Sequence, residues 1–319
     1  MDKNKKSGLI VLIVIIAITI LSGILHIARA SNNCTNPRSN DSKETIVQTR
    51  KNGYIAALYI EGVISEANST YNQDWILNTI ARLKKDKRNK GIALFLDTPG
   101  GAVYETDEVY LALQDYKTTD RPVYAYQAAI AASGGYYISC AANKIYANRN
   151  TLTGSIGIIC GTSIDITGLM ESIGIKSNTF HSGRNKTMLS YNEPLTNEQR
   201  EIMQSISDEC YEQFTGIVSS CRNIPIDKVK QIADGRIYTA KQALSNGLID
   251  VIDSWENMIS EMEDTFFEGK SLEVIDFKYE NSTFLQGIIG DRLFGKGIRT
   301  PIDTIISKTT MRYPAFLYE

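Results

Sequence analysis

A serine followed by two glycines, Ser133-Gly134-Gly135, stands where a strand-like run gives way to a helix-like one. Residues 123–126 are β-branched and aromatic, small residues follow them, and a helical pattern then continues to Asn143. The first backbone N–H groups of a helix lack intrahelical partners and favour negative charge, so an oxyanion formed there would be stabilised. The sequence therefore predicts a nucleophilic serine at position 133. A serine that only caps the helix is the alternative.

A nucleophilic serine needs a neighbouring base to accept its proton, and this chain offers few. Of its 2 histidines, His26 lies in an apolar N-terminal run, which leaves His181 for chemistry in water. A lysine can act as the base if burial or nearby positive charge lowers its pKa. Lys186 is the candidate, since it lies in a polar, glycine-containing stretch followed by apolar Met188 and Leu189. An ordinary solvated lysine is the alternative.

A second glycine pair follows a strand that is apolar on both faces. The run of residues 91–96, GIALFL, is typical of a covered parallel strand, and DTPGG follows it from Asp97 to Gly101. Glycines in a turn between strand and helix expose backbone N–H groups that can bind an anion. The pair could also serve only to make the turn.

Strand and helix patterns alternate through the rest of the chain, which favours an α/β fold with a largely parallel sheet. Thr196 with Gln199, and Thr239 with Gln242, fit the capping boxes that begin helices. The first of these helices is expected to run to about Arg222. Strands are expected at residues 54–64 and 144–147, helices at 75–83 and 107–116, and a loop with a strand at 151–159.

Composition excludes several classes of protein. The net charge is -2 and 43% of residues are hydrophobic, which argues against intrinsic disorder and against binding nucleic acid through bulk charge. The 5 cysteines form no C-x-x-C pair, so no zinc or redox motif is indicated and no cofactor or metal is expected. The cysteines are Cys34, Cys140, Cys160, Cys210 and Cys221.

The N-terminus has the pattern of a membrane anchor. A basic stretch, residues 1–7, precedes an apolar segment at residues 8–28 that is long enough to cross a bilayer. By the positive-inside rule the first seven residues are cytoplasmic and the rest of the chain is extracytoplasmic, with residues 29–52 as a polar linker. A signal peptide cleaved after Ala30 is the alternative, since Ala28-Arg29-Ala30 fits a cleavage site.

Five blocks of sequence, taken in order, resemble signal peptide peptidases of the SppA type. These blocks are IEGVI, DTPGG, the stretch from YQAAIAASGGYY to GSIGII, SGRNKTMLSYNEPLTNEQR, and IADGRIYTAKQALSNGLID. The resemblance implies a crotonase-like α/β fold of stacked ββα units, shared with Clp proteases. It also implies a membrane-anchored serine endopeptidase that forms homo-oligomers and hydrolyses signal peptides and other short or unfolded peptides through an acyl-enzyme.

Carried over position by position, the resemblance gives a catalytic site without cofactor or metal. Ser133 would be the nucleophile, Lys186 the general base, and Ser155 the group that orients the lysine. The backbone N–H groups of Gly101 and Gly134 would form the oxyanion hole. The protease domain is then expected at residues 53–262, with a tail at 263–319 for oligomer or membrane-surface contacts. The closing residues MRYPAFLYE form a segment that is apolar enough to occupy a peptide groove.

Three rival functions stay open at this point. The chain could be a non-catalytic membrane-tethered scaffold on the same fold, or an acyl-CoA enzyme of the crotonase type, because that architecture also surrounds an oxyanion with turn N–H groups. It could also be a Ser-His-Asp hydrolase that uses His181. The presence of every residue expected of a Ser-Lys peptidase favours the peptidase.

Overall fold

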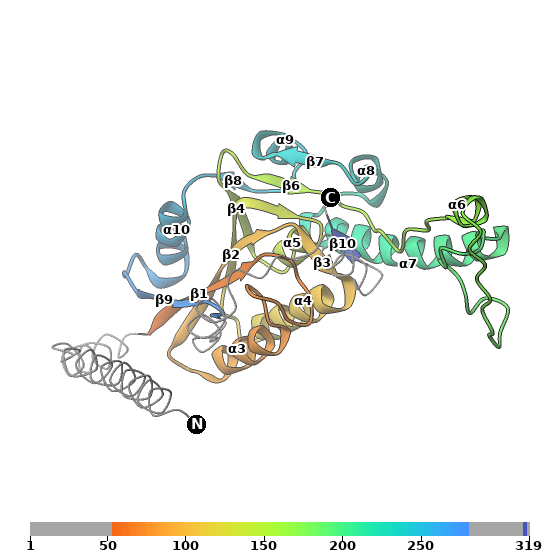
Figure 1. Cartoon of the computed structure of the whole chain (residues 1–319). Coiled ribbons are helices and arrows are strands. Elements are labelled where there is room, and N and C mark those ends of the chain that lie inside the picture. The colour runs from red at the N-terminus through yellow and green to blue at the C-terminus, as the bar shows by residue number, and fades with distance from the viewer. Residues whose placement is uncertain (1–52, 281–314, 318–319) are drawn as a thin grey trace, which may run out of the picture. The chain divides into compact units, whose positions relative to one another are not determined.

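The computed structural model describes residues 53–280 and 315–317 of the chain (Figure 1). The predicted anchor and linker lie outside the described residues, as do residues 281–314 and 318–319 of the predicted tail. Within the described part, no helix combines the length and apolarity needed to cross a bilayer.

The centre of the fold is an 8-stranded sheet with the order β7-β6-β4-β2-β1-β9, in which β5 pairs with β4 and with β8. Every pairing in it is parallel except that of β6 with β7, so the predicted α/β fold with a largely parallel sheet is confirmed. The strands are β1 (Tyr54–Glu61), β2 (Asn89–Thr98), β4 (Val123–Ala132), β5 (Lys144–Ala147), β6 (Leu152–Gly154), β7 (Ile237–Thr239), β8 (Val251–Ile252) and β9 (Glu273–Phe277).

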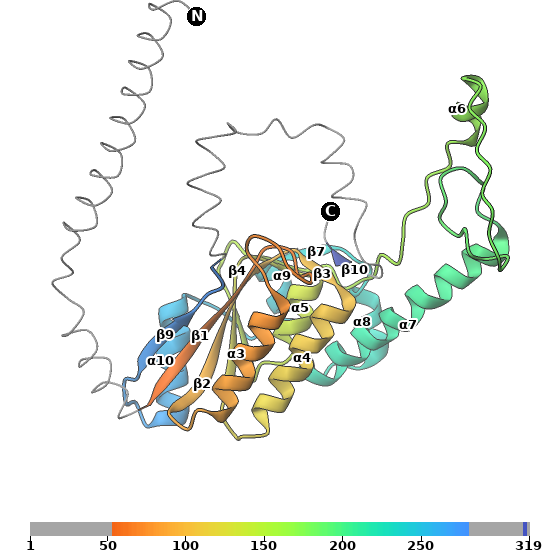
Figure 2. The same cartoon turned by 60° about the horizontal axis from the view of Figure 1, so that its bottom comes forward.

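Successive side chains of a strand point to opposite faces of the sheet, and in these strands the side chains on both faces are largely apolar. Helices therefore cover both faces of the sheet. Helices α3 (Gln73–Lys85) and α4 (Val103–Lys117) pack on one face, and α10 (Trp255–Phe267) packs on the other (Figures 1 and 2). A further apolar cluster joins α5 (Gly134–Ser139) to α7 (Asn197–Arg222), α8 (Ile226–Ile232) and α9 (Ala240–Ser245). The start of α5 is thereby buried on all sides.

Both predicted capping boxes are present. The side chain of Thr196 accepts from the Gln199 N–H at the start of α7, and Thr239 does the same for Gln242 at the start of α9. Residues 160–196, called the arm below, include α6 (Thr167–Ser172) and extend from the far end of α7, away from the sheet (Figure 2).

The structure moves several predicted boundaries. Helix α5 ends at Ser139 rather than Asn143, and β6 ends at Gly154, so residues 155–159 continue as loop rather than strand. Past residue 262, where the tail was expected to begin, α10 runs on to Phe267 and β9 then pairs with β1. The folded domain therefore extends into the predicted tail, because β9 completes the edge of the sheet.

Candidate active site

Ser133 occupies a strained position between β4 and α5. Its φ of 53° is rare for a residue with a side chain and costs about 1–3 kcal/mol. Backbone bonds hold it there, from Ser133 N to Gly154 O at 2.7 Å and from Tyr137 N to Ser133 O at 2.9 Å. The side chain is 0% exposed and its Oγ has no hydrogen-bond partner, not even as a helix cap. The alternative of a simple capping serine therefore fails, and the hydroxyl is left free to react.

The two predicted oxyanion glycines lie side by side. A Cβ built on Gly134 would stand 3.3 Å from Gly101 N and 3.3 Å from Gly100 Cα, so the backbones approach closely. Gly101 lies in β3 (Gly100–Ala102), where a Cβ would stand only 1.8 Å from the Ile64 carbonyl oxygen. Gly100 has a φ of 102°, which favours glycine. Gly100, Gly101 and Gly134 are thus required by space and conformation, beside Ser133.

Two residues that the sequence argument did not single out hold these backbones in place. Thr98 at the end of β2 accepts from Gly100 N at 3.1 Å, and it pairs with Ala131 just before the nucleophile. Asp97 accepts from Ile130 N at 3.1 Å, at an irregularity in the β2–β4 pairing. Asp97 and Thr98 both belong to the DTPGG turn that the sequence analysis identified, but their roles could be recognised only once β4 was known to be the partner strand.

Ser155 lies next to Ser133 through the pairing of β6 with β4. Ala132 is paired with Gly154, so Ser133 and Ser155 follow directly at the ends of two neighbouring parallel strands. Ser155 is 5% exposed, has a φ of 49°, and donates its backbone N–H to Arg236 O at 2.8 Å. Four of the five predicted site residues are therefore together in one chain.

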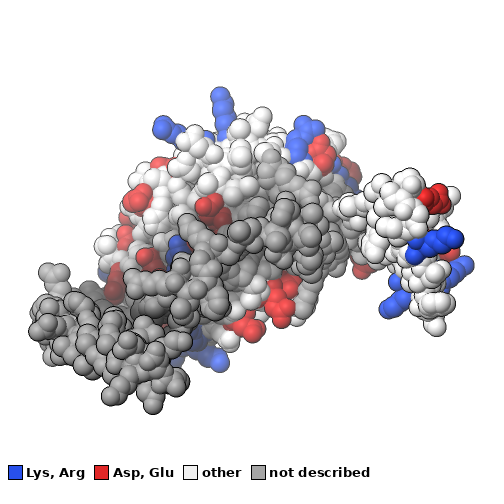
Figure 3. Space-filling view, in the orientation of Figure 1, with Lys and Arg blue, Asp and Glu red and all other residues white. Residues whose placement is uncertain are grey.

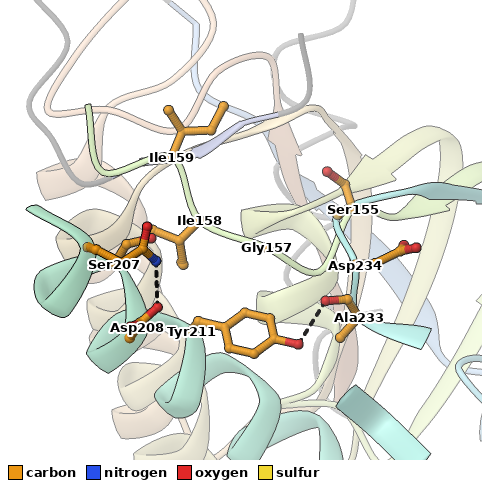
Figure 4. A pocket seen from close by; sticks show the side chains of 11 residues that line it. Ser155, Gly157, Ile158, Ile159, Ser207, Asp208, Tyr211, Ala233 and Asp234 are labelled. Atoms are coloured by element: carbon orange, nitrogen blue, oxygen red, sulfur yellow. Dashed lines mark hydrogen bonds between the residues drawn. The ribbon is translucent and has the colours of Figure 1, made fainter. Parts of the chain in front are cut away.

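A pocket of about 580 Å³ opens beside Ser155 (Figure 4). One wall is the loop that carries Ile158 and Ile159, and another is α7, from which Tyr211 donates to the Ala233 carbonyl at 2.9 Å. Carboxylates of Asp208 and Asp234 add polar groups to the lining. The space is large enough for peptide side chains next to the nucleophile.

Lys186, the fifth predicted residue, is not at the site of its own chain. It lies on the arm, between α6 and α7, and its side chain is exposed. Figures 1 and 2 both show the arm well away from α5. Neighbouring Arg184 pairs with Glu198 at 2.7 Å and so does not face Ser133 either. Within the described residues, the structure does not bring the base to the nucleophile.

Tyr137 in α5 is structural rather than catalytic. Burial raises the pKa of its hydroxyl, and a hydrogen bond to Asp107 at 2.5 Å raises this pKa further. Gln213 of α7 donates to the same oxygen at 2.7 Å. The neutral phenol therefore ties α4, α5 and α7 together behind Ser133.

His181 also lies on the arm and is exposed, with its Nδ1 3.1 Å from the Gly183 carbonyl oxygen. Because no carboxylate in the described structure bonds this ring, a Ser-His-Asp triad has no support. We expect His181→Ala to retain most of its peptidase activity, measured as kcat/KM on a casein-derived peptide. Loss of activity comparable to that of a Ser133→Ala variant would revive the histidine mechanism.

Several known proteins are similar in sequence to this chain over most of its length. A family model described as peptidase family S49 matches residues 115–266. A protein of Enterococcus faecium that is named as a signal peptide peptidase, SppA, is 32% identical over 94% of this chain and 90% of its own length. The chain belongs to peptidase family S49. The S49 match spans the strand, nucleophile turn and helix described above, so the buried Ser133 lies inside the family's domain.

Two other S49 relatives are longer than this chain. The chloroplastic serine protease SPPA of Arabidopsis thaliana is 32% identical over an aligned region that covers 66% of this chain and 31% of the Arabidopsis protein. Protease 4 of Salmonella typhi is 30% identical over 65% of this chain and 34% of its own length. These similarities, with the family match, make the chain a serine protease. Among the described residues, no group of three or more His, Cys, Asp or Glu could hold a metal ion.

Proposed function

We propose that this S49 peptidase is a serine endopeptidase with Ser133 as nucleophile and Lys186 as general base. The observation that carries the proposal is the fully buried, unpartnered Ser133 hydroxyl beside the Gly101 and Gly134 backbone. Ser133 attacks the peptide carbonyl carbon as its proton passes to the lysine amine, and the lysine then gives that proton to the departing amine as the peptide C–N bond breaks. The N–H groups of Gly101 and Gly134 stabilise the oxyanion, Ser155 orients the amine, and water hydrolyses the acyl-enzyme.

One experiment tests the nucleophile and the reaction class together. A serine-directed phosphonate should label the protein at Ser133, identified by peptide mapping, and abolish hydrolysis with matching stoichiometry. Ser133→Ala serves as the control, because it removes the nucleophile and should take up no label. Labelling at any residue other than Ser133 would contradict the assignment.

The substrates we propose are signal peptides and other short or unfolded peptides. The Enterococcus relative is named for signal peptides, and the buried site of this chain is bordered by a pocket whose lining mixes apolar side chains such as Ile158 and Ile159 with polar ones. Residues 8–28 would anchor the enzyme in the cell membrane with its catalytic domain outside the cytoplasm, where such peptides are found. Sensitivity of the domain to protease added to spheroplasts tests this placement.

The base is proposed to come from a second copy of the chain. The arm that carries Lys186 also exposes large apolar side chains, which is typical of an interface that another protein covers. These residues are Ile164, Leu169, Ile173, Ile175, Phe180 and Tyr191, and Phe180 is 97% exposed. Figure 3 shows the arm as a separate lobe on which cationic and acidic side chains stand among uncharged surface. Docked on a neighbour, the arm would lose this apolar surface to the interface and bring its lysine to a buried serine.

Peptides are proposed to bind by adding a strand to β3. Ile64 forms a parallel bridge with Gly101 through two hydrogen bonds: the Ile64 N–H donates to the Gly100 carbonyl, and the Ala102 N–H donates to the Ile64 carbonyl. The N–H and C=O of Gly101 therefore point to the opposite edge of β3. On that edge β10 (Ala315–Leu317) pairs antiparallel with β3, with Phe316 opposite Gly101. The chain's own C-terminal residues thus take the course that a bound peptide would follow.

Deleting residues 313–319 tests whether this segment competes with substrate. Removal of a competing strand should lower KM for a short peptide and leave kcat unchanged, because the catalytic groups are untouched. A synthetic peptide with the sequence of residues 311–319 should inhibit the truncated enzyme competitively. A peptide of the same composition in scrambled order is the matched control. An unchanged KM in the truncated enzyme would contradict the proposal that this segment competes with substrate.

A further inference from the structure

A second buried hydroxyl shares the unusual state of the nucleophile. Among the side-chain hydroxyls that are buried in the described residues, only those of Ser133 and Thr106 lack a hydrogen-bond partner. Thr106 lies in the first turn of α4 and is 0% exposed. A buried hydroxyl without a partner reduces stability, so its presence requires an explanation.

Thr106 does not use the bond that helical threonines commonly make to a carbonyl one turn earlier. Thr215 in α7, also 0% exposed, does use it, donating to Tyr211 O at 2.9 Å. The Thr106 hydroxyl therefore remains available in a helix where a local partner is within ordinary reach.

The hydroxyl faces the oxyanion glycines. A Cβ built on Gly134 would stand 2.7 Å from Thr106 Oγ1 and 3.3 Å from Gly101 N. Both groups thus lie against Gly134, packed so closely around its Cα that no side chain fits there. One is an N–H already assigned to the oxyanion hole, and the other is an O–H that can rotate toward an acceptor.

We propose that the Thr106 hydroxyl is a third hydrogen-bond donor of the oxyanion hole, an inference that rests on the serine peptidase function above. The donor has no partner in the free enzyme, and gains one when negative charge develops on the carbonyl oxygen. An interaction that is made only in the transition state raises kcat rather than lowering KM. Thr106 is on this assignment a catalytic residue, touching the reacting oxygen.

The test compares Thr106→Val, which keeps the shape and removes the hydroxyl, with Thr106→Ser, which keeps the hydroxyl. The valine variant should lose about 10²-fold in kcat with KM nearly unchanged, as expected for one oxyanion donor. Its affinity for a peptide boronate, which mimics the tetrahedral intermediate, should fall in parallel, and the serine variant should restore most of both. Thr215→Val is the matched control and should lower Tm while leaving kcat intact.

The valine variant should melt no lower than the wild type, because an unsatisfied buried hydroxyl has been replaced by a methyl group. Normal turnover in Thr106→Val, or equal loss in the serine and valine variants, would overturn the proposal. Phosphonate labelling distinguishes a failure of the peptidase mechanism from a failure of the role proposed for Thr106. A wild-type enzyme that is not labelled at Ser133 contradicts the peptidase mechanism itself, whereas a labelled and fully active valine variant contradicts only the role of Thr106.

Discussion

Mixing Ser133→Ala subunits with Lys186→Ala subunits should restore peptide hydrolysis that neither variant shows alone. Each single variant loses one half of the dyad, so we expect kcat to fall on the order of 10³-fold or more. If the lysine of one copy serves the serine of its neighbour, random mixing rebuilds both halves at about one quarter of the sites. The measurement is kcat after the two variants are dissociated, mixed and reassembled.

This result separates assembly in trans from a site completed within one chain. The structure places Ser133 in the buried centre and Lys186 on the exposed arm, so a site within one chain requires the arm to fold back. In that case the mixture would stay as inactive as its parts. A Phe180→Asp variant provides a second test. Its charge replaces a 97% exposed apolar side chain, so it should block docking and lower activity at low enzyme concentration.

The sequence predicted the strand-to-helix turn at Ser133 because local signals there agree with the fold. Small residues before Ser133, and glycines after it, mark a place where backbones pass close together, and Gly134 and Gly101 do so. The capping boxes at Thr196 and Thr239 depend on residues three positions apart, so they too could be identified without tertiary information.

The position of the lysine could not be predicted in this way. Lys186 is followed by apolar Met188 and Leu189, which suggested burial, yet its stretch of chain leads out along the arm. A pattern of apolar residues shows that a surface is covered by something, but it does not say whether the cover is the same chain or another copy. The exposed apolar side chains of the arm, which the proposed second copy would cover, could be identified only after the fold was known.

The edge of the sheet was missed for a related reason. Residues 273–277 alternate weakly and carry two acidic residues, so their sequence does not resemble the apolar central strands. An edge strand has one partner and half-exposed side chains, which removes the signal used for β2. Pairing with Tyr54–Leu58 of β1, which is distant in sequence, decides their structure.

Gly101→Ala should reduce kcat/KM by about 10²- to 10³-fold, the loss typical of one oxyanion donor. Its Cβ would stand 1.8 Å from the Ile64 oxygen and 2.5 Å from the Ile64 carbon, so β3 must move rather than a flexible side chain. Any such shift carries the Gly101 N–H away from Gly134 and from the carbonyl oxygen that it must meet. Steady-state kinetics on a peptide substrate measure the effect.

Gly216→Ala in α7 is the matched control, because a Cβ there meets nothing within 4 Å. Alanine in the interior of a helix should stabilise the fold by about 0.5–1 kcal/mol, with activity unchanged. Phosphonate labelling of Gly101→Ala should slow as much as hydrolysis does, since both reactions develop charge on an oxygen held by the same amide. If the alanine enzyme instead turned over at the normal rate with a normal Tm, the strand would have moved without consequence. The oxyanion would then have to be stabilised elsewhere than beside Gly134.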